Sequence, residues 1–90
     1  MIYKIHKVEE DGVVLLKLSG RFSSEDVAEL DRQCEQPSGG RDLVLDLEEL
    51  KLVDQDVVRF LERCEANGAR LQNCPPYIRQ WITQERDRRS

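Results

Sequence analysis

The chain has only one histidine and no closely spaced cysteines, which argues against a metal-bound or disulfide-bonded scaffold. Its three cysteines, Cys34, Cys64 and Cys74, are widely spaced and form no Cys-X-X-Cys pair, and His6 is the only histidine in 90 residues. A structural zinc site needs four such ligands at close spacings, and a disulfide framework needs an even number of thiols. We therefore expect no metal and no cofactor, and we expect the cysteines to act as small core hydrophobes.

The sequence also lacks a basic stripe and a long apolar run. Its net charge of −4 argues against a surface that neutralises nucleic-acid phosphates. Residues 1–7 have no apolar core of the kind found in signal peptides, and no apolar segment approaches the ~20 residues of a membrane-spanning helix. We expect a cytoplasmic protein that neither binds nucleic acid nor inserts into a membrane.

An almost uninterrupted apolar strand, residues 41–47 (RDLVLDL), organises the rest of the chain. A short acidic connection follows it, and then apolar residues recur at helical spacing from Val57 to Leu61. This pattern predicts a buried central strand that feeds a helix through a polar loop. Asp54 is the expected N-cap of that helix, which should end at Asn67-Gly68. The loop between the strand and the helix is where we look for function.

The flanking segments predict a small α/β domain with a mixed four-stranded sheet and three main helices. Residues 2–8 and 12–19 should pair antiparallel around an Asp-Gly turn, and the second of these strands should lie parallel to the central one. Ser23 and Asp26 predict the start of a first helix, and Pro75-Pro76 the start of the last. Residues 69–73 supply a fourth, short strand. We assign residues 1–84 to the domain and residues 85–90 to a charged tail, with fraying expected from Gln84 onward.

Four segments in this order carry a resemblance to a known family. They are residues 13–22 (VVLLKLSGRF), 43–47 (LVLDL), 52–54 (LVD) and 68–71 (GARL). Together they resemble the STAS domain, which is named after sulfate transporters and bacterial anti-sigma factor antagonists. The similarity extends from Ile2 to the helix that contains Trp81. It implies a non-catalytic protein-protein interaction module.

In the antagonists of this family, the loop after the central strand reads Asp-Ser-Ser-Gly or a close variant, and a partner kinase phosphorylates the second hydroxyl residue. Alignment on Asp54 places Gln55 on the first hydroxyl position, Asp56 on the phosphorylated one and Val57 on the glycine. Residues 41–76 contain no Ser, Thr or Tyr, so this loop has no hydroxyl to phosphorylate. Asp56 is then either a weak permanent mimic of the phosphorylated state or a carboxylate favoured at a helix N-terminus.

We therefore predict that the chain is a protein-protein interaction module that resembles an anti-sigma factor antagonist. The same resemblance implies that its partner is an anti-sigma factor or a kinase-like regulator. Parallel strands deliver their outgoing loops to one edge of the sheet. The predicted partner-binding residues at that edge are Arg21, Phe22, Ser23, Asp54, Gln55, Asp56, Val57 and Cys74.

The sequence is also compatible with two other functions and with a homodimer. The main alternative is a module that binds a small lipidic or anionic ligand at the same edge, as a component of a transport system. An enzyme built on a reactive Cys74 thiolate ranks last.

Overall fold

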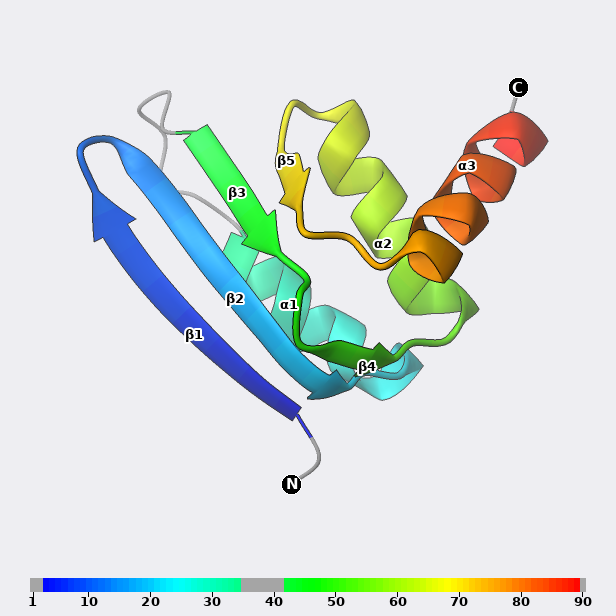
Figure 1. The fold of residues 1–90 in the computed structure, drawn as a ribbon, viewed down its shortest axis with the longest axis horizontal. Helices are drawn as coiled ribbons and strands as arrows, with labels where there is room; N and C mark the ends of the chain where they lie inside the picture. The colour runs from blue at the N-terminus through cyan, green and yellow to red at the C-terminus, as the bar shows by residue number, and fades with distance from the viewer. Residues whose placement is uncertain (1–2, 35–41, 90) are drawn as a thin grey trace.

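The computed structural model of the chain describes residues 3–34 and 42–89. Along the chain the elements are β1 (Tyr3–Glu10), β2 (Val13–Arg21), the 3-10 helix η1 (Ser24–Asp26), α1 (Val27–Cys34), β3 (Asp42–Asp46), β4 (Leu50–Leu52), α2 (Gln55–Ala66), β5 (Arg70–Gln72) and α3 (Pro76–Arg89). The predicted α/β class with a mixed sheet and three main helices is confirmed (Figure 1). The described residues form one short strand more than the four expected.

The sheet has the order β1-β2-β3-β5, with β4 paired to the end of β2. The β1–β2 pair is antiparallel, whereas β2–β3 and β3–β5 are parallel, as the sequence predicts. Asp11 and Gly12 make the hairpin turn with φ of 51° and 78°. Two successive left-handed residues match the right-handed twist of the flanking strands, which is why Asp-Gly is favoured at this turn.

One face of the sheet carries the hydrophobic core. Alternate residues of β2, namely Val14, Leu16 and Leu18, are fully buried in one cluster with residues of α1 and α2, and α1 lies behind the sheet in Figure 1. Helix α3 packs on α2 rather than on the sheet, and it contributes Ile78 and Ile82 to the same core. The residues between the buried ones in β2 point to the opposite face, where the described part of the chain places no helix.

Strand β4 lies within the segment that the sequence predicts as a simple connection. Leu50 pairs with Gly20 and Leu52 with Arg21, and the register shifts between the two pairs. Gly20 adopts a φ of 93° at this irregularity, a conformation that glycine tolerates best. The backbone N–H of Phe22 also donates to the Leu52 carbonyl at 2.9 Å. The connection is thereby fixed to the end of β2.

The predicted fraying from Gln84 is wrong, because α3 remains helical as far as Arg89. Glu85, which the sequence places in the charged tail, is only 6% exposed. Its carboxylate accepts hydrogen bonds from Gln55 Nε2 at 3.1 Å and from Arg59 Nε at 3.2 Å, and both donors belong to α2. The last turns of α3 are therefore held against α2 by contacts that a charge pattern does not reveal.

Candidate functional site

The side chain of Asp54 joins two loops at the edge of the sheet. Its Oδ1 accepts a hydrogen bond from the backbone N–H of Val57 at 3.1 Å, which confirms Asp54 as the N-cap of α2. Its Oδ2 accepts from the backbone N–H of Ser24 at 2.6 Å. The loop after β2 and the loop before α2 therefore lie together, as the topology predicts.

The loop after β2 is also braced within itself. The backbone N–H of Ser23 donates to Asp26 Oδ2 at 2.9 Å, and the Ser23 hydroxyl donates to the same oxygen at 3.3 Å. The Asp26 N–H donates in return to the Ser23 carbonyl at 2.9 Å. The predicted start after Ser23 is confirmed, although the first turn is the 3-10 helix η1 and α1 follows it. These bonds give the loop one defined conformation.

The predicted partner-binding residues differ in their access to solvent. Arg21, Gln55 and Asp56 are exposed, and Ser23, Asp54 and Cys74 are half-buried. Phe22 and Val57 are only 3% and 0% exposed, so neither side chain is available to a partner. Phe22 packs instead on the ring of Tyr3, with 4.7 Å between the ring centroids. These two residues support the edge from inside the core.

Two exposed apolar residues at this edge escape the sequence prediction. Leu52 is 54% exposed at the end of β4, and Tyr77 is 48% exposed in the first turn of α3. The Tyr77 hydroxyl donates to the Lys51 carbonyl at 2.8 Å, which holds the start of α3 beside β4. The sequence pattern predicts that Tyr77 is buried or half-buried on the last helix, or else exposed as part of a docking face, and it predicts nothing for the side chain of Leu52. No signal in the sequence shows that Leu52 is exposed at the end of β4.

We use the name loop edge for five exposed residues contributed by β2, β4, α2 and α3. They are Arg21, Leu52, Gln55, Asp56 and Tyr77. Asp56 lies in the first turn of α2, and its Oδ1 is 3.9 Å from Arg59 Nη1. Both of these side chains are about half exposed, so water screens the pair and it adds little stability. The Asp56 carboxylate is thus accessible to solvent at the start of α2.

The structure does not support a reactive thiolate at Cys74. Burial raises the pKa of this half-buried thiol, and it outweighs the opposing charge of Arg79. The Sγ atom lies 3.6 Å from the Pro75 carbonyl, to which it donates. The charged groups that act on Cys74 are Arg79 and Glu65, which do not belong to the loop edge.

Cys34 and Cys64 form a thiol pair that the sequence prediction missed. The two side chains hydrogen-bond to each other between α1 and α2, and this contact raises the pKa of Cys34 and lowers that of Cys64. All three cysteines are free, and each packs, partly buried, against the core. Their expected role as small apolar residues is consistent with this packing, but the pairing depends on how the two helices meet.

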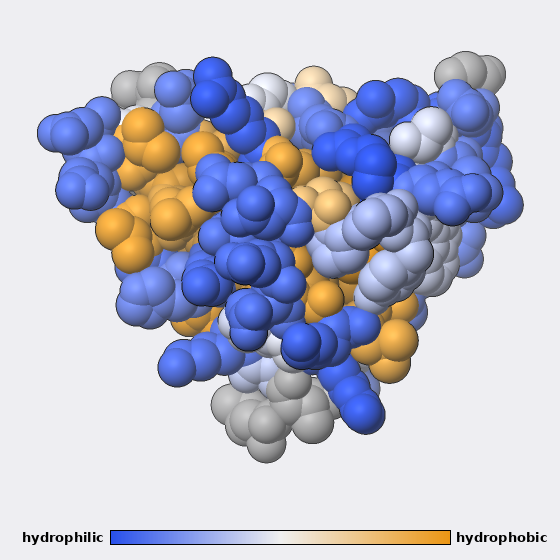
Figure 2. Space-filling model, viewed as in Figure 1, coloured by the Kyte–Doolittle hydropathy of each residue, from blue (hydrophilic) through white to orange (hydrophobic). Residues whose placement is uncertain are grey.

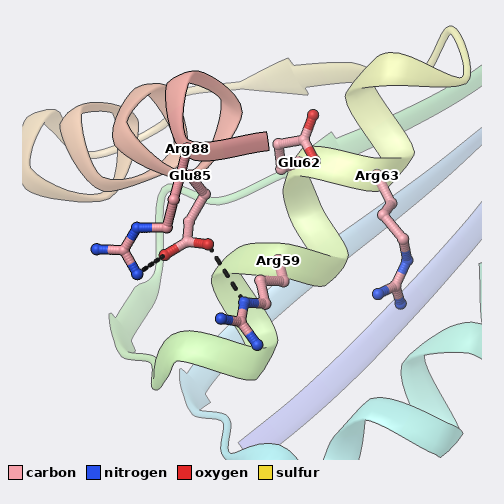
Figure 3. A pocket seen from close by; sticks show the side chains of 5 residues that line it. All are labelled: Arg59, Glu62, Arg63, Glu85 and Arg88. Atoms are coloured by element: carbon pink, nitrogen blue, oxygen red, sulfur yellow. Dashed lines mark hydrogen bonds and ion pairs between the residues drawn. The ribbon is translucent and has the colours of Figure 1, made fainter. Parts of the chain in front are cut away.

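A hollow of about 320 Å³ between α2 and α3 is lined by charged side chains. They are Arg59, Glu62, Arg63, Glu85 and Arg88. Glu85 is shared by Arg59 at 3.2 Å and Arg88 at 3.9 Å (Figure 3), and Arg63 lies 3.8 Å from Asp31. Since each of these arginines already has a carboxylate partner, an anionic ligand would have to displace one. The cluster is best understood as an ion-pair network that joins the two helices.

Within residues 3–34 and 42–89, no group of three or more His, Cys, Asp or Glu side chains is arranged to hold a metal ion. No helix among the described residues combines the length and apolarity needed to cross a bilayer. Comparison with known proteins adds no assignment, because no protein-family model and no curated protein sequence matches the chain.

Proposed function

We propose that the chain is a non-catalytic docking module of the cytoplasm that binds a regulatory protein at the loop edge, in the manner of the anti-sigma factor antagonists that its sequence resembles. The observation that carries this proposal is the hydrogen bond between Asp54 and Ser24, which fixes two loops beside the exposed Leu52 and Tyr77. The partner would be an anti-sigma factor or a related kinase-like regulator.

The composition of the loop edge suits a protein-protein contact. Leu52 and Tyr77 provide apolar surface that is already exposed in the free chain, and tyrosine is enriched at the centres of interfaces. Arg21 and Asp56 provide charges of both signs beside them. Because the loops are already hydrogen-bonded, binding costs little conformational entropy.

The charge of Asp56 distinguishes this edge from that of a phosphorylated antagonist. A carboxylate carries one negative charge at neutral pH, whereas a phosphoserine carries about −1.5 to −2 and can be removed by a phosphatase. An aspartate at this position holds the edge in a single charge state. The module would then be regulated by the amount of partner or of the chain itself, and not by phosphorylation of this loop.

A small anionic ligand has less support at this edge. The helix N-terminus that would receive an anion already carries Asp54 as its cap and Asp56 in its first turn. An enzyme built on Cys74 also lacks support, because burial favours the protonated thiol.

The test compares capture of native lysate proteins by immobilised wild type, Leu52→Asp and Val8→Asp. Leu52 and Val8 are both exposed apolar strand residues, but Val8 lies on β1, away from the loop edge. We expect wild type and Val8→Asp to recover an anti-sigma-factor-like kinase, identified by mass spectrometry, and Leu52→Asp to lose it. Equal recovery by all three proteins, or recovery of no regulatory protein, would contradict the proposal.

A further inference from the structure

The sheet face opposite the core carries an apolar patch. Val13 and Leu15 of β2 lie on this face, because the residues between and after them are buried on the other side. Leu15 pairs with Val8 of β1 on one side and with Val44 of β3 on the other, so their side chains share the face. We call Val8, Val13, Leu15 and Val44 the sheet-face patch. Val8 is 37% exposed, and the other three are half-buried.

Acidic side chains lie at the hairpin end of the sheet-face patch. Glu10 and Asp42 each pair with Val13 from opposite sides, and Asp11 forms the adjacent turn. Together with the sheet-face patch, Glu10, Asp11 and Gln72 line a shallow hollow of about 360 Å³. Figure 2 looks onto this face and shows an orange area over the hairpin-side halves of β1, β2 and β3, bordered by blue hydrophilic residues.

Basic side chains lie on the other side of the sheet-face patch. Lys17 pairs with His6, and Lys4 pairs with Ser19, so these residues continue the same face toward the end of β2. Asp46 also pairs with Lys17, but it is only 8% exposed. Its Oδ1 accepts from the Glu48 N–H at 3.0 Å and from Asn73 Nδ2 at 3.3 Å. Along β1, β2 and β3 the accessible charge therefore changes from acidic to basic, with apolar residues between, and the exposed Arg70 of β5 pairs with Val44 beside the patch.

We infer that the sheet-face patch is the interface of a homodimer in which a second copy packs face to face, with its strands running in the opposite direction. The two-fold axis would lie between the two sheets and cross the strands at the level of Leu15. This rotation places the acidic hairpin end of each copy over the basic end of the other. The favourable charge contact is made twice, as a two-fold interface requires.

The charge pattern selects this arrangement over the alternatives. If the strands of the two copies ran in the same direction, the acidic hairpin ends would face each other and the basic ends would face each other, which is unfavourable. Face-to-face sheets pack about 10 Å apart, close enough for apolar side chains to interdigitate and for the flanking charges to meet. Because the loop edge lies at the other end of β2, dimerisation would leave it free. The inference does not depend on the function proposed above.

The test is sedimentation equilibrium of wild type, Lys17→Glu, Glu10→Lys and an equimolar mixture of the two variants, from micromolar to near-millimolar concentration. Lys17→Glu makes both ends of the patch acidic, and Glu10→Lys makes the hairpin end less acidic and the patch more basic overall. We expect each variant alone to dimerise at least about tenfold more weakly than wild type. The mixture should form heterodimers more readily than either variant forms homodimers, because the unchanged acidic hairpin end of Lys17→Glu then lies over the unchanged basic end of Glu10→Lys.

A third variant, Leu15→Lys, separates this interface from contacts made elsewhere. Leu15 is half-buried on the open face, so the substitution should abolish dimers while circular dichroism remains that of the wild type. If Leu15→Lys proves unfolded, the two charge variants still test the interface. They should remain folded, since Glu10 is exposed and Lys17 lies outside the core. A wild type that is monomeric throughout, whatever else the patch binds, overturns the inference. So does a dimer that all three substitutions leave unchanged, because it would use another surface, such as the unpaired edge of β1.

Discussion

The Oδ2 atom of Asp54 lies 2.6 Å from the backbone nitrogen of Ser24, although 30 positions separate the two residues in the chain. The same carboxylate caps α2 through Val57, so one side chain serves the helix start and the contact between two loops. A hydrogen bond to a charged acceptor is about twice as strong as a neutral one. Asp54 therefore stabilises both the fold and the shape of the loop edge.

Replacing Asp54 should cost more than replacing its neighbour Asp56. Asp54→Ala removes the N-cap and the bond to Ser24, and we expect a loss of about 1 to 3 kcal/mol in the free energy of unfolding. Asp56→Ala removes only an interaction with the helix dipole and a weak pair with Arg59, so its cost should be about 0.3 to 1 kcal/mol. Urea unfolding measures both values.

Asp54→Asn is the matched control for that comparison. The amide keeps one oxygen, which is enough to accept from Val57, but its nitrogen cannot accept from Ser24. Its stability should fall between those of wild type and Asp54→Ala. If Asp54→Asn is as stable as wild type, the bond to Ser24 contributes nothing measurable.

Acid should weaken the attachment of α3 to α2. The pKa of Glu85 is lowered from its ordinary value of 4.5, mainly by the hydrogen bond from Gln55 and further by Arg59 and Arg88. A carboxyl group whose pKa is lower in the folded state contributes stability that is present above its ordinary pKa and is lost as the pH falls through the folded value. Glu85→Gln should therefore be less stable than wild type at neutral pH.

The decisive measurement is how the difference in stability between wild type and Glu85→Gln depends on pH. Urea midpoints of wild type and Glu85→Gln should differ at about pH 7 and converge as the pH falls below 4.5, when the wild-type carboxylate takes up its proton. Glu49→Gln, at an exposed position in the turn before β4, is the control for the same exchange outside the contact between α2 and α3. A Glu85→Gln difference that is independent of pH would show that the ion pairs are not its cause.

Local patterns in the sequence predict most of the fold. The Asp11-Gly12 hairpin, the capping of α2 by Asp54 and the end of that helix at Asn67-Gly68 all arise from interactions within a few residues. Strand β4 was missed because three residues are too few for a periodic signal and their partners, Gly20 and Arg21, lie far back in the chain. The ordered end of α3 was missed for a related reason, since Glu85 finds its partners on another helix.

The contact between the two loops was predicted, but the exposure of the side chains around it was not. The order of strands and helices brings the loops at Ser24 and Asp54 to one edge, and the structure confirms their contact. Which side chains face outward depends on packing, and packing buries Phe22 and exposes Leu52. A loop of a few residues is too short to show a periodic pattern of apolar residues, so its sequence does not indicate which side chains are exposed.

The cysteines should differ in their reactivity toward iodoacetamide at neutral pH. Cys74 should react slowly, because burial raises its pKa and little thiolate is present. Cys34 should also react slowly, since its pKa is raised by the hydrogen bond with Cys64 and by burial. Cys64, whose pKa is lowered by the same pairing, should be the faster of the two paired thiols.

Peptide mapping of partly alkylated protein gives the three rates. Cys64→Ser supplies a control, because loss of its thiol should change the rate at Cys34 and leave the rate at Cys74 unchanged. Rapid modification of Cys74 in the folded protein would restore the case for a reactive thiolate at that position.

The last prediction concerns Asp56, which the sequence resemblance aligns with a phosphorylated residue. Asp56 is exposed in the first turn of α2, and residues 41–76 contain no hydroxyl side chain. Incubation of wild type with ATP and the captured kinase-like partner should therefore leave this loop unmodified by mass spectrometry. In Asp56→Ser, the new hydroxyl should lie at the accessible start of the helix and gain a phosphate.

If Asp56 mimics the phosphorylated, released state, then Asp56→Ser and Asp56→Ala should both bind the partner more tightly, because each removes a charge that must be desolvated at the edge. Calorimetric titration of the three proteins decides this point. Equal or weaker binding by both variants would show that Asp56 is only a carboxylate favoured by the helix dipole and that docking is constitutive.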